Sequence, residues 1–317
     1  MLAIVLALAS AIGYGGSDFA AGLASRSAGV IQVTLLASAV SVIVAAAALP
    51  FAAGHPPSAA ALAWGAVAGL GGTTGALALY LGFRHAAFSV AGPISAVGAA
   101  GFSVLAGLLL GERPTALALT GIVLALPAII AVSASAASAS FKSDEQAADD
   151  PATPASAASP ASPASPASAA SPASAPGRPA IGVAAGLVAG ACFALLFIGL
   201  NRAGSGSGLW PVAATQVAEL TVALAVAVAT RNVRLPGARP RLLAVITGAT
   251  GAAGTILFFF ASHEGFLAVT AVLTSLYPAV TIVLARTMLG ERLTALRLAG
   301  LTLAAACVAL IAVGSAG

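Results

Sequence analysis

Long apolar runs are the feature that most limits how this chain can fold. Of its 317 residues, 60% are hydrophobic and only 7% are charged, whereas an average soluble domain carries roughly 25% charged residues. Several runs reach the ~20 residues that a helix needs to cross the ~30 Å hydrocarbon core of a bilayer. The composition therefore excludes a water-soluble enzyme and predicts an all-α polytopic membrane protein.

The apolar runs are continuous and lack the strict alternation of a transmembrane strand, which favours helices over a β-barrel. Polar, glycine or proline residues separate them, as at 111–114 and 204–208. This punctuation predicts ten transmembrane helices, at residues 2–24, 30–52, 60–83, 87–110, 115–133, 181–202, 209–230, 242–262, 266–289 and 295–314.

A hydrophilic linker separates the fifth predicted helix from the sixth. Residues 134–180 are rich in Ala, Ser and Pro and contain Ser-Pro-Ala repeats, as at 159–166. Such a composition has little to bury and predicts disorder. We interpret the segment as a tether, with a regulatory or glycosylated arm as the alternative. The predicted domains are a five-helix unit at 1–133, this linker, and a second five-helix unit at 181–317.

The chain contains an internal repeat. The sequence LGERPTAL at 110–117 returns as LGERLTAL at 289–296, with seven of eight residues identical. This match sets a repeat register, in which Arg113 pairs with Arg292. Five helices per unit is an odd number, so the second unit must lie inverted in the membrane. Two inverted five-helix repeats are typical of secondary transporters, whose substrate site lies near the midplane between the repeats. The same register pairs three glycines in each unit: Gly69, Gly72 and Gly75 with Gly248, Gly251 and Gly254.

Two units that each end their fourth helix in LGER resemble EamA-type transporters of the drug/metabolite transporter superfamily. The stretch GYGGSDF at 13–19 is similar to the family's first-helix W-G-x-x-F region, with Tyr14 in place of tryptophan. The resemblance covers nearly the whole chain except the linker, and it implies a ten-helix carrier of small metabolites, often an exporter. The family's mid-helix proline matches Pro278, but the paired position is Ala99 and Pro93 lies six residues earlier. The two units are therefore not expected to bend symmetrically.

Two acidic residues lie inside predicted spans, Glu219 in the seventh and Asp18 in the first. An ionised acid at the bilayer centre costs on the order of 2.5–3.5 kcal/mol, so such residues usually serve a function. The repeat register pairs Glu219 with Val40 and Asp18 with Phe197, so neither acid is duplicated. This difference favours a proton carrier or a counter-ion for a cation. The alternative is a structural acid bound by neighbouring hydroxyls or by Asn201.

Other polar side chains in the spans extend this candidate pathway. Gln216 precedes Glu219 by three residues and Tyr14 precedes Asp18 by four, which places each pair on one helix face. Tyr277 lies mid-span beside a proline and is a candidate to line a cavity. The predicted substrate or proton pathway is therefore Glu219, Asp18, Gln216, Tyr14, Asn201 and Tyr277.

The LGER motif supplies the pairs Glu112–Arg113 and Glu291–Arg292, which end equivalent helices on opposite membrane faces. Because the motif is present on both membrane faces, it does not favour a gate that acts on one face only. We interpret each pair as a structural helix-end motif, with a local ion pair that helps to fix the turn into the next span.

Several other function classes find little support. No histidine lies mid-span, no acidic or histidine cluster has catalytic or metal-ligand spacing, and no nucleotide-binding motif is visible. The sequence thus predicts no enzyme activity, cofactor, metal or nucleic acid, and a proton-coupled exporter whose partners are a small-molecule substrate, protons and membrane lipids. Alternatives are a flippase for a lipid-linked intermediate, which needs a laterally open cavity, and a non-transporting scaffold or sensor, which needs a sealed interface around Glu219. The sequence does not indicate the oligomeric state.

Charge gives conflicting information on orientation. Most cations flank loops on one side, the densest group being at 231–241, and the positive-inside rule would place that side in the cytoplasm and both termini outside. The family resemblance implies cytoplasmic termini, and we favour that orientation because the cations are concentrated in one loop and in the linker. One lysine against twelve arginines suggests a GC-rich genome and hence a bacterial plasma membrane.

Overall fold

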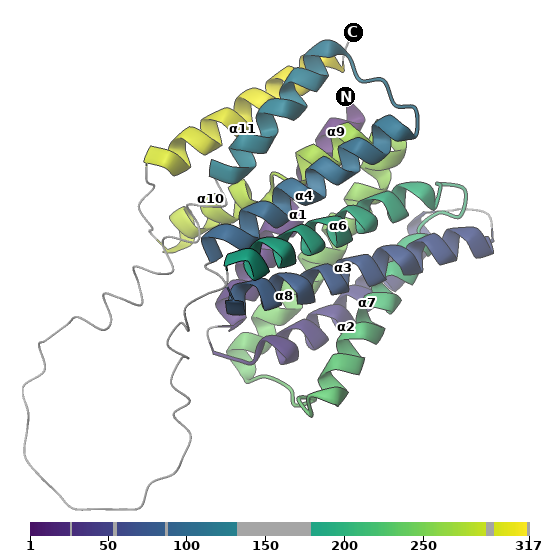
Figure 1. Ribbon diagram of the computed structural model, residues 1–317. Coiled ribbons are helices and arrows are strands. Elements are labelled where there is room, and N and C mark those ends of the chain that lie inside the picture. Colours follow the sequence, from purple (N-terminus) through teal and green to yellow (C-terminus); the bar gives the residue numbers. More distant parts are fainter. Residues whose placement is uncertain (26, 53–55, 86–87, 132–178, 290–294, 316–317) are drawn as a thin grey trace, which may run out of the picture.

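The computed structural model describes residues 1–25, 27–52, 56–85, 88–131, 179–289 and 295–315. Within these ranges the regular structure is helical, with no strands (Figure 1). The helices are α1 (Leu2–Ser25), α2 (Val30–Ala48), the 3-10 turn η1 (Leu49–Phe51), α3 (Ala59–His85), α4 (Phe88–Leu109), a helix at Ala116–Ala131, α6 (Pro179–Arg202), α7 (Trp210–Ala229), α8 (Ala238–Glu264), α9 (Leu267–Thr274), α10 (Tyr277–Leu289) and α11 (Ala295–Gly314).

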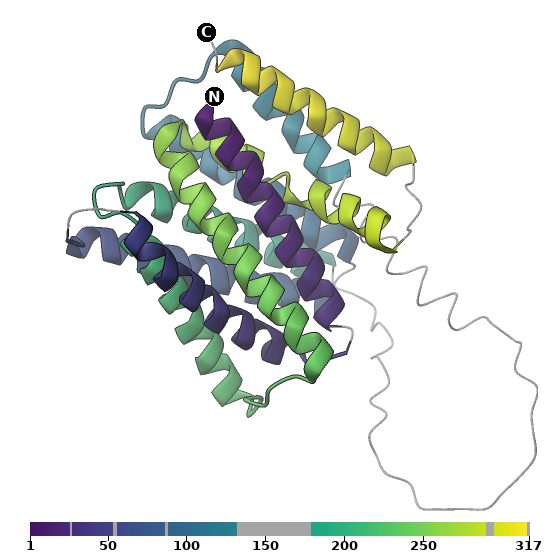
Figure 2. The same ribbon diagram turned by 180° about the vertical axis from the view of Figure 1, so that it is seen from behind.

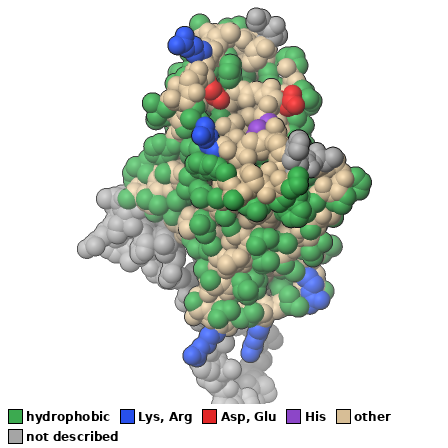
Figure 3. All heavy atoms as spheres, turned by 90° about the vertical axis from the view of Figure 1, so that its right-hand side faces the viewer, with side chains coloured by type: hydrophobic (Ala, Val, Ile, Leu, Met, Phe, Trp, Pro, Cys, Tyr) green, Lys and Arg blue, Asp and Glu red, His purple; other side chains and the backbone are tan. Residues whose placement is uncertain are grey.

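The described helices are those of a multi-pass membrane protein. Seven segments are long and apolar enough to cross a bilayer, α9 and α10 counting together as one, and three shorter apolar helices accompany them at Ile94–Leu109, Ala116–Ala131 and Leu298–Gly314. Figure 3 shows one face on which the few charged side chains gather in two groups, with mainly hydrophobic and uncharged surface between them. The predicted all-α polytopic class is confirmed.

Two details differ from the predicted boundaries. Helix α6 begins at Pro179, so it includes two residues that we assigned to the linker; residues 134–178 of that linker lie outside the described residues. The predicted single span at 266–289 is interrupted between Thr274 and Tyr277. Pro278 is the second residue of α10, and its missing N–H cannot continue the helix from Thr274. Helix α4 runs without a break through Ala99, so the two helices differ, as the unpaired proline predicted.

The first half of the chain (residues 2–131) and the second half (179–314) pack with exchanged partners. Helix α1 lies along α8, and α3 lies along α6; in the same way α2 contacts α8 while α3 contacts α7 (Figures 1 and 2). Glycines allow these close contacts. A Cβ on Gly13 would lie 2.8 Å from the Cα of Gly254, and one on Gly71 would lie 2.6 Å from the carbonyl oxygen of Cys192.

The bounds of several helices match between the halves. In the register set by the two LGER motifs, α3 and α8 begin and end at equivalent positions, and α4 and α9 begin at equivalent positions. Near the C-terminus, α11 packs against the helix Ala116–Ala131, with Thr115 donating a 2.7 Å hydrogen bond to the carbonyl of Gly314. The repeat seen in the sequence is thus reflected in helix length as well as in residue identity.

The helix ends define two faces of the molecule. We call one the termini face, which gathers Met1, Ser58, Glu112, Arg202, Glu264 and Gly314, and the other the opposite face, which gathers Ser25, Gly29, Thr230 and Gly237. One large buried cluster, which includes Leu200, Val212, Phe258 and Leu267, lies toward the termini face. A small cluster of Ala24, Val33 and Ala244 lies toward the opposite face.

Candidate transport site

Glu219 lies on the side of α7 that faces the first half. Its carboxylate passes over Gly72 of α3, where a Cβ would lie 2.5 Å from Oε1, and Leu196 of α6 is next to the same glycine. The exposed residues Val217 and Thr221 of α7 are turned about 160° away from it, at about 100° per residue. Glu219 therefore points into the bundle, at the junction between the two halves.

The structure revises which residue of the first half corresponds to Glu219. Gly69 packs on the carbonyl of Thr215, and its repeat partner Gly248 packs on the carbonyl of Ala37. These contacts align Ala37 with Thr215, one position short of the LGER register, so Glu219 corresponds to Ser41 and not to Val40. Ser41 donates a buried 2.9 Å hydrogen bond to the carbonyl of Gly248. At equivalent positions, the first half thus has a hydroxyl that already donates a hydrogen bond, and the second half has an acid.

Asp18 lies on α1 near the contacts of this helix with the second half. It is exposed, yet on α1 it lies between Tyr14, which contacts α8, and Gly15, which contacts α10. The outward side of α1 carries Val5 and Ile12, each 61% exposed, and is about 120–140° away at about 100° per residue. Asp18 therefore lies on the side of α1 between its contacts with α8 and with α10.

Tyr14 lies one turn before Asp18 on α1, and its hydroxyl reaches α8. Its hydroxyl lies 3.0 Å from Oγ1 of Thr255, which itself donates to the carbonyl of Gly251. Because the one proton of Thr255 is used in that bond, Tyr14 donates to Thr255 and keeps its lone pairs free. Within the described part of the chain, neither carboxylate has a hydrogen-bond or ion-pair partner, although each lies among packed helices.

Gln216 and Asn201 have different surroundings. The side chain of Gln216 is 1% exposed, and its Oε1 has no hydrogen-bond partner among the described residues. It lies one turn before Glu219 on the same side of α7. Asn201 instead donates a 2.8 Å hydrogen bond to the carbonyl of Ser262, which ties α6 to α8 near the termini face. The structure therefore gives Asn201 a packing contact away from Glu219 and brings Gln216 next to it.

Tyr277 begins α10 directly after the interruption in the ninth span. It is half-buried. The main-chain oxygen of Tyr277 packs on Gly15 of α1, where a Cβ would lie 2.7 Å away. Ser275, in the interruption itself, is buried and its hydroxyl has no partner among the described residues. The sequence did not identify Thr255 or Ser275 as candidates, because the sequence alone does not show which group a hydroxyl within a span will contact.

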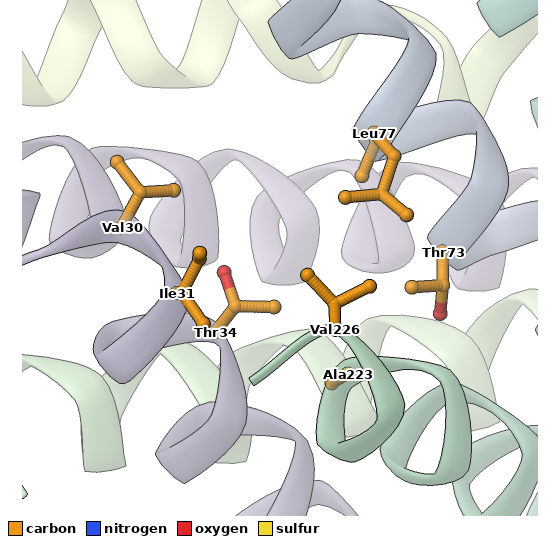
Figure 4. Close-up of a pocket in the computed structure, with 8 residues that line it drawn as sticks. Val30, Ile31, Thr34, Thr73, Leu77, Ala223 and Val226 are labelled. Carbon is orange, nitrogen blue, oxygen red and sulfur yellow. The ribbon is translucent and has the colours of Figure 1, made fainter. Parts of the chain in front are cut away.

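A small apolar pocket lies between α2, α3 and α7, on the side of α7 that carries Glu219. Figure 4 shows Ile31, Thr34, Thr73 and Val226 converging on it from the three helices. Its volume is about 50 Å³, far below the roughly 300–1,000 Å³ of a typical ligand site. Thr73 follows Gly72, on which Glu219 rests, so the pocket begins beside the acid and extends toward the opposite face.

The helix-end motifs are only partly described. Glu291 and Arg292 lie outside the described residues. Glu112 does not form the local ion pair that we expected with Arg113; its carboxylate accepts hydrogen bonds from two backbone N–H groups of α9 instead. The reason is geometric, because the turn after α4 directs this side chain across to the second half. Among the described residues, no group of three or more His, Cys, Asp or Glu could hold a metal ion.

These features define a class: a multi-pass, all-helical membrane protein with two acids in its apolar helices. Residues 1–134 match the EamA-like transporter family, in agreement with the resemblance that the sequence motifs predicted. No curated protein matches the chain. A crystal structure, titled only as that of a protein, is similar over 96% of this chain and 97% of its own length, with a TM-score of 0.65 and 16% sequence identity. At that identity the likeness shows the fold alone.

Proposed function

We propose that this chain is a proton-coupled exporter of small metabolites or drugs that works by alternating access between two inverted five-helix repeats. The repeats are residues 1–133 and 181–317, joined by the linker 134–180. The single observation that carries the proposal is the pair Asp18 and Glu219. One acid comes from each repeat, both lie within membrane-spanning helices, and neither has a hydrogen-bond or ion-pair partner among the described residues.

The inverted arrangement is supported by the exchanged packing of the halves. When α1 and α6, α2 and α7, and α3 and α8 are interchanged, the main helix contacts map onto one another. Such an arrangement has a natural alternative conformation, in which each half takes the packing of the other and the access path moves to the opposite face. The Glu112 cap on α9 and the pocket that extends toward the opposite face fit a conformation closed at the termini face.

The acids supply the coupling. A protonated carboxyl is neutral and moves through the low-dielectric interior at much lower cost than a carboxylate. In the proposed cycle, Glu219 or Asp18 takes a proton from one side, the repeats exchange conformation, and the proton leaves to the other side. Tyr14 and Gln216 supply a donor and acceptors for the carboxyl in either state. Tyr277, at the start of α10, lines the same space.

The test is proton flux in proteoliposomes that contain the purified full chain and a pH-sensitive dye. Separate pools of amino acids, sugars and aromatic amines serve as probes, and at least one pool is expected to drive proton movement. Glu219→Gln or Asp18→Asn should reduce that movement by about tenfold or more, as expected for loss of a proton-carrying group. Glu264→Gln, an exposed acid at the end of α8, is the matched control and should retain it. Unchanged coupling in both site variants would refute the proposal.

The location follows from the same proposal. We place the carrier in a bacterial plasma membrane with cytoplasmic termini. A reporter fused to the C-terminus and active only in the cytoplasm tests this orientation, and an inactive but stable fusion would reverse it.

A further inference from the structure

The end of α4 has a geometry that the helix-end interpretation did not foresee. Gly111 has φ +92°, a left-handed conformation that favours glycine. The N–H of Gly111 donates to the carbonyl of Leu108, and that of Glu112 donates to the carbonyl of Gly107, each at 3.0 Å. This pair of bonds is the Schellman termination of a helix. It reverses the chain and turns Glu112 back along its own helix.

The carboxylate of Glu112 then caps a helix of the other half. It accepts hydrogen bonds from the backbone N–H groups of Leu267 and Ala268, the latter at 2.9 Å. These are the first two residues of α9, whose N-cap Phe266 forms no side-chain capping bond. A carboxylate at a helix N-terminus is favoured by charge-assisted hydrogen bonds and by the helix dipole. The contact therefore joins the two halves at the termini face.

Gly107 makes this arrangement sterically possible. A Cβ at Gly107 would lie 2.3 Å from Oε2 of Glu112 and 3.0 Å from its Cδ, so any side chain there would displace the carboxylate. The register that aligns the two LGER motifs pairs Gly107 with Arg286. The second motif thus keeps the glutamate, Glu291, but lacks the glycine. The geometry seen at Glu112 is available to one motif only.

We propose that Glu112, seated on Gly107, is a one-sided latch: it holds the two halves together at the termini face and must release α9 before that face opens. This inference rests on the alternating access proposed above. It explains how a motif present on both membrane faces can still act on one of them, because the difference lies in the residue four positions before the motif's Gly-Glu pair.

The test is thiol accessibility at the termini face. A single cysteine replaces Leu200, which is fully buried there, in a background where Cys192 and Cys307 are alanine. Reaction with a polar maleimide is followed in detergent, without substrate. Glu112→Ala and Gly107→Ala should each raise the reaction rate roughly tenfold, the change expected when charge-assisted bonds to two amides are lost. Alanine is a better helix former than glycine, so Gly107→Ala is not expected to unfold α4.

The controls are Gly101→Ala, whose added Cβ meets nothing within 4 Å, and Glu291→Gln in the second motif. Neither should change the rate. The latch is overturned if both latch variants leave the rate unchanged, or if the controls raise it equally. The proton-flux assay is independent of this result: higher reactivity without any coupled transport would keep the latch and reject the carrier, and coupled transport with unchanged reactivity would do the reverse.

Discussion

The termini face and the opposite face of this protein are built from equivalent helices but are packed differently. At the termini face, Phe197 and Phe258 stack with ring centroids 4.4 Å apart, Asn201 ties α6 to α8, and Glu112 caps α9. At the opposite face, the buried cluster around Val33 is small, and a pocket opens between α2, α3 and α7. The termini face thus has an aromatic contact and a polar contact within the second half and the Glu112 cap between the halves, whereas at the opposite face a hydrogen bond from Gln32 to Asn232 joins the halves.

This difference shows where a duplicated protein places its asymmetry. A perfect inverted repeat would pack both faces alike and would favour neither access state. Here the helices repeat, while a few residues do not: Gly107 is paired with Arg286, and Ala99 with Pro278. Small departures from the repeat decide which face is closed in the structure.

The largest expected effect is on accessibility. In a cysteine-free background, Thr34→Cys, in the pocket, should react with a polar maleimide more than about tenfold faster than Val212→Cys, which is fully buried at the termini face. The buried thiol reacts only from a transiently opened state. Reaction rates of the purified protein, measured by mass shift, check this. Equal rates would remove the contrast between the two faces.

Stability should follow the same contrast. Phe258→Ala removes a fully buried ring at the termini face and should lower the free energy of unfolding by about 3 kcal/mol, the lower end for such changes because lipid replaces water as the solvent of the separated helices. Val33→Ala, in the small cluster, should cost about 1 kcal/mol. Denaturation in mixed micelles followed by circular dichroism measures both. A larger loss for Val33→Ala would reverse the assignment of the tight face.

The smallest effect should be equal in the two halves. A Cβ on Gly69 or on Gly248 would lie 2.2 Å from a carbonyl oxygen of α7 or α2, respectively. Either alanine should destabilise the protein by about 1–3 kcal/mol through overpacking. Gly101→Ala, with open space at its Cβ, should be neutral or slightly stabilising. Thermal unfolding in detergent compares the three variants, and a clear difference between Gly69→Ala and Gly248→Ala would show that the repeats are not equivalent at these crossings.

Much of the fold could be predicted because it depends on local pattern. Apolar length placed a helix in each predicted span. Pro278 predicted that the two units would bend differently, but not that the ninth span would be interrupted before it. The register of the repeat was visible from the uncommon residues in LGER. It failed by one position in α7, because alanine-rich helices contain too few distinctive residues to reveal a shift. Only the packing of Gly69 and Gly248 on carbonyls corrected it.

The candidate site was harder to predict because it depends on contacts across the chain. Glu219 and Asp18 stood out in the sequence because they are acids within apolar spans. The hydrogen bond between Tyr14 and Thr255 could not be predicted, because its two residues come from different halves. Asn201 looked equally polar in the sequence, and only the carbonyl of Ser262 explains its place. Glu112 bonds backbone amides of the other half, and a backbone amide carries no sequence signal. The pathway residues remain predictions until flux is measured.

The glycine contacts of α1 with α8 and of α3 with α6 also limit how the molecule can rearrange. Gly13 and Gly71 bring main chain against main chain at the crossing points. Sliding one helix along its partner by a turn would drive a side chain into a carbonyl group. Each of these pairs should therefore move as one rigid unit, and most of the bending should occur in α4, α9 and α10.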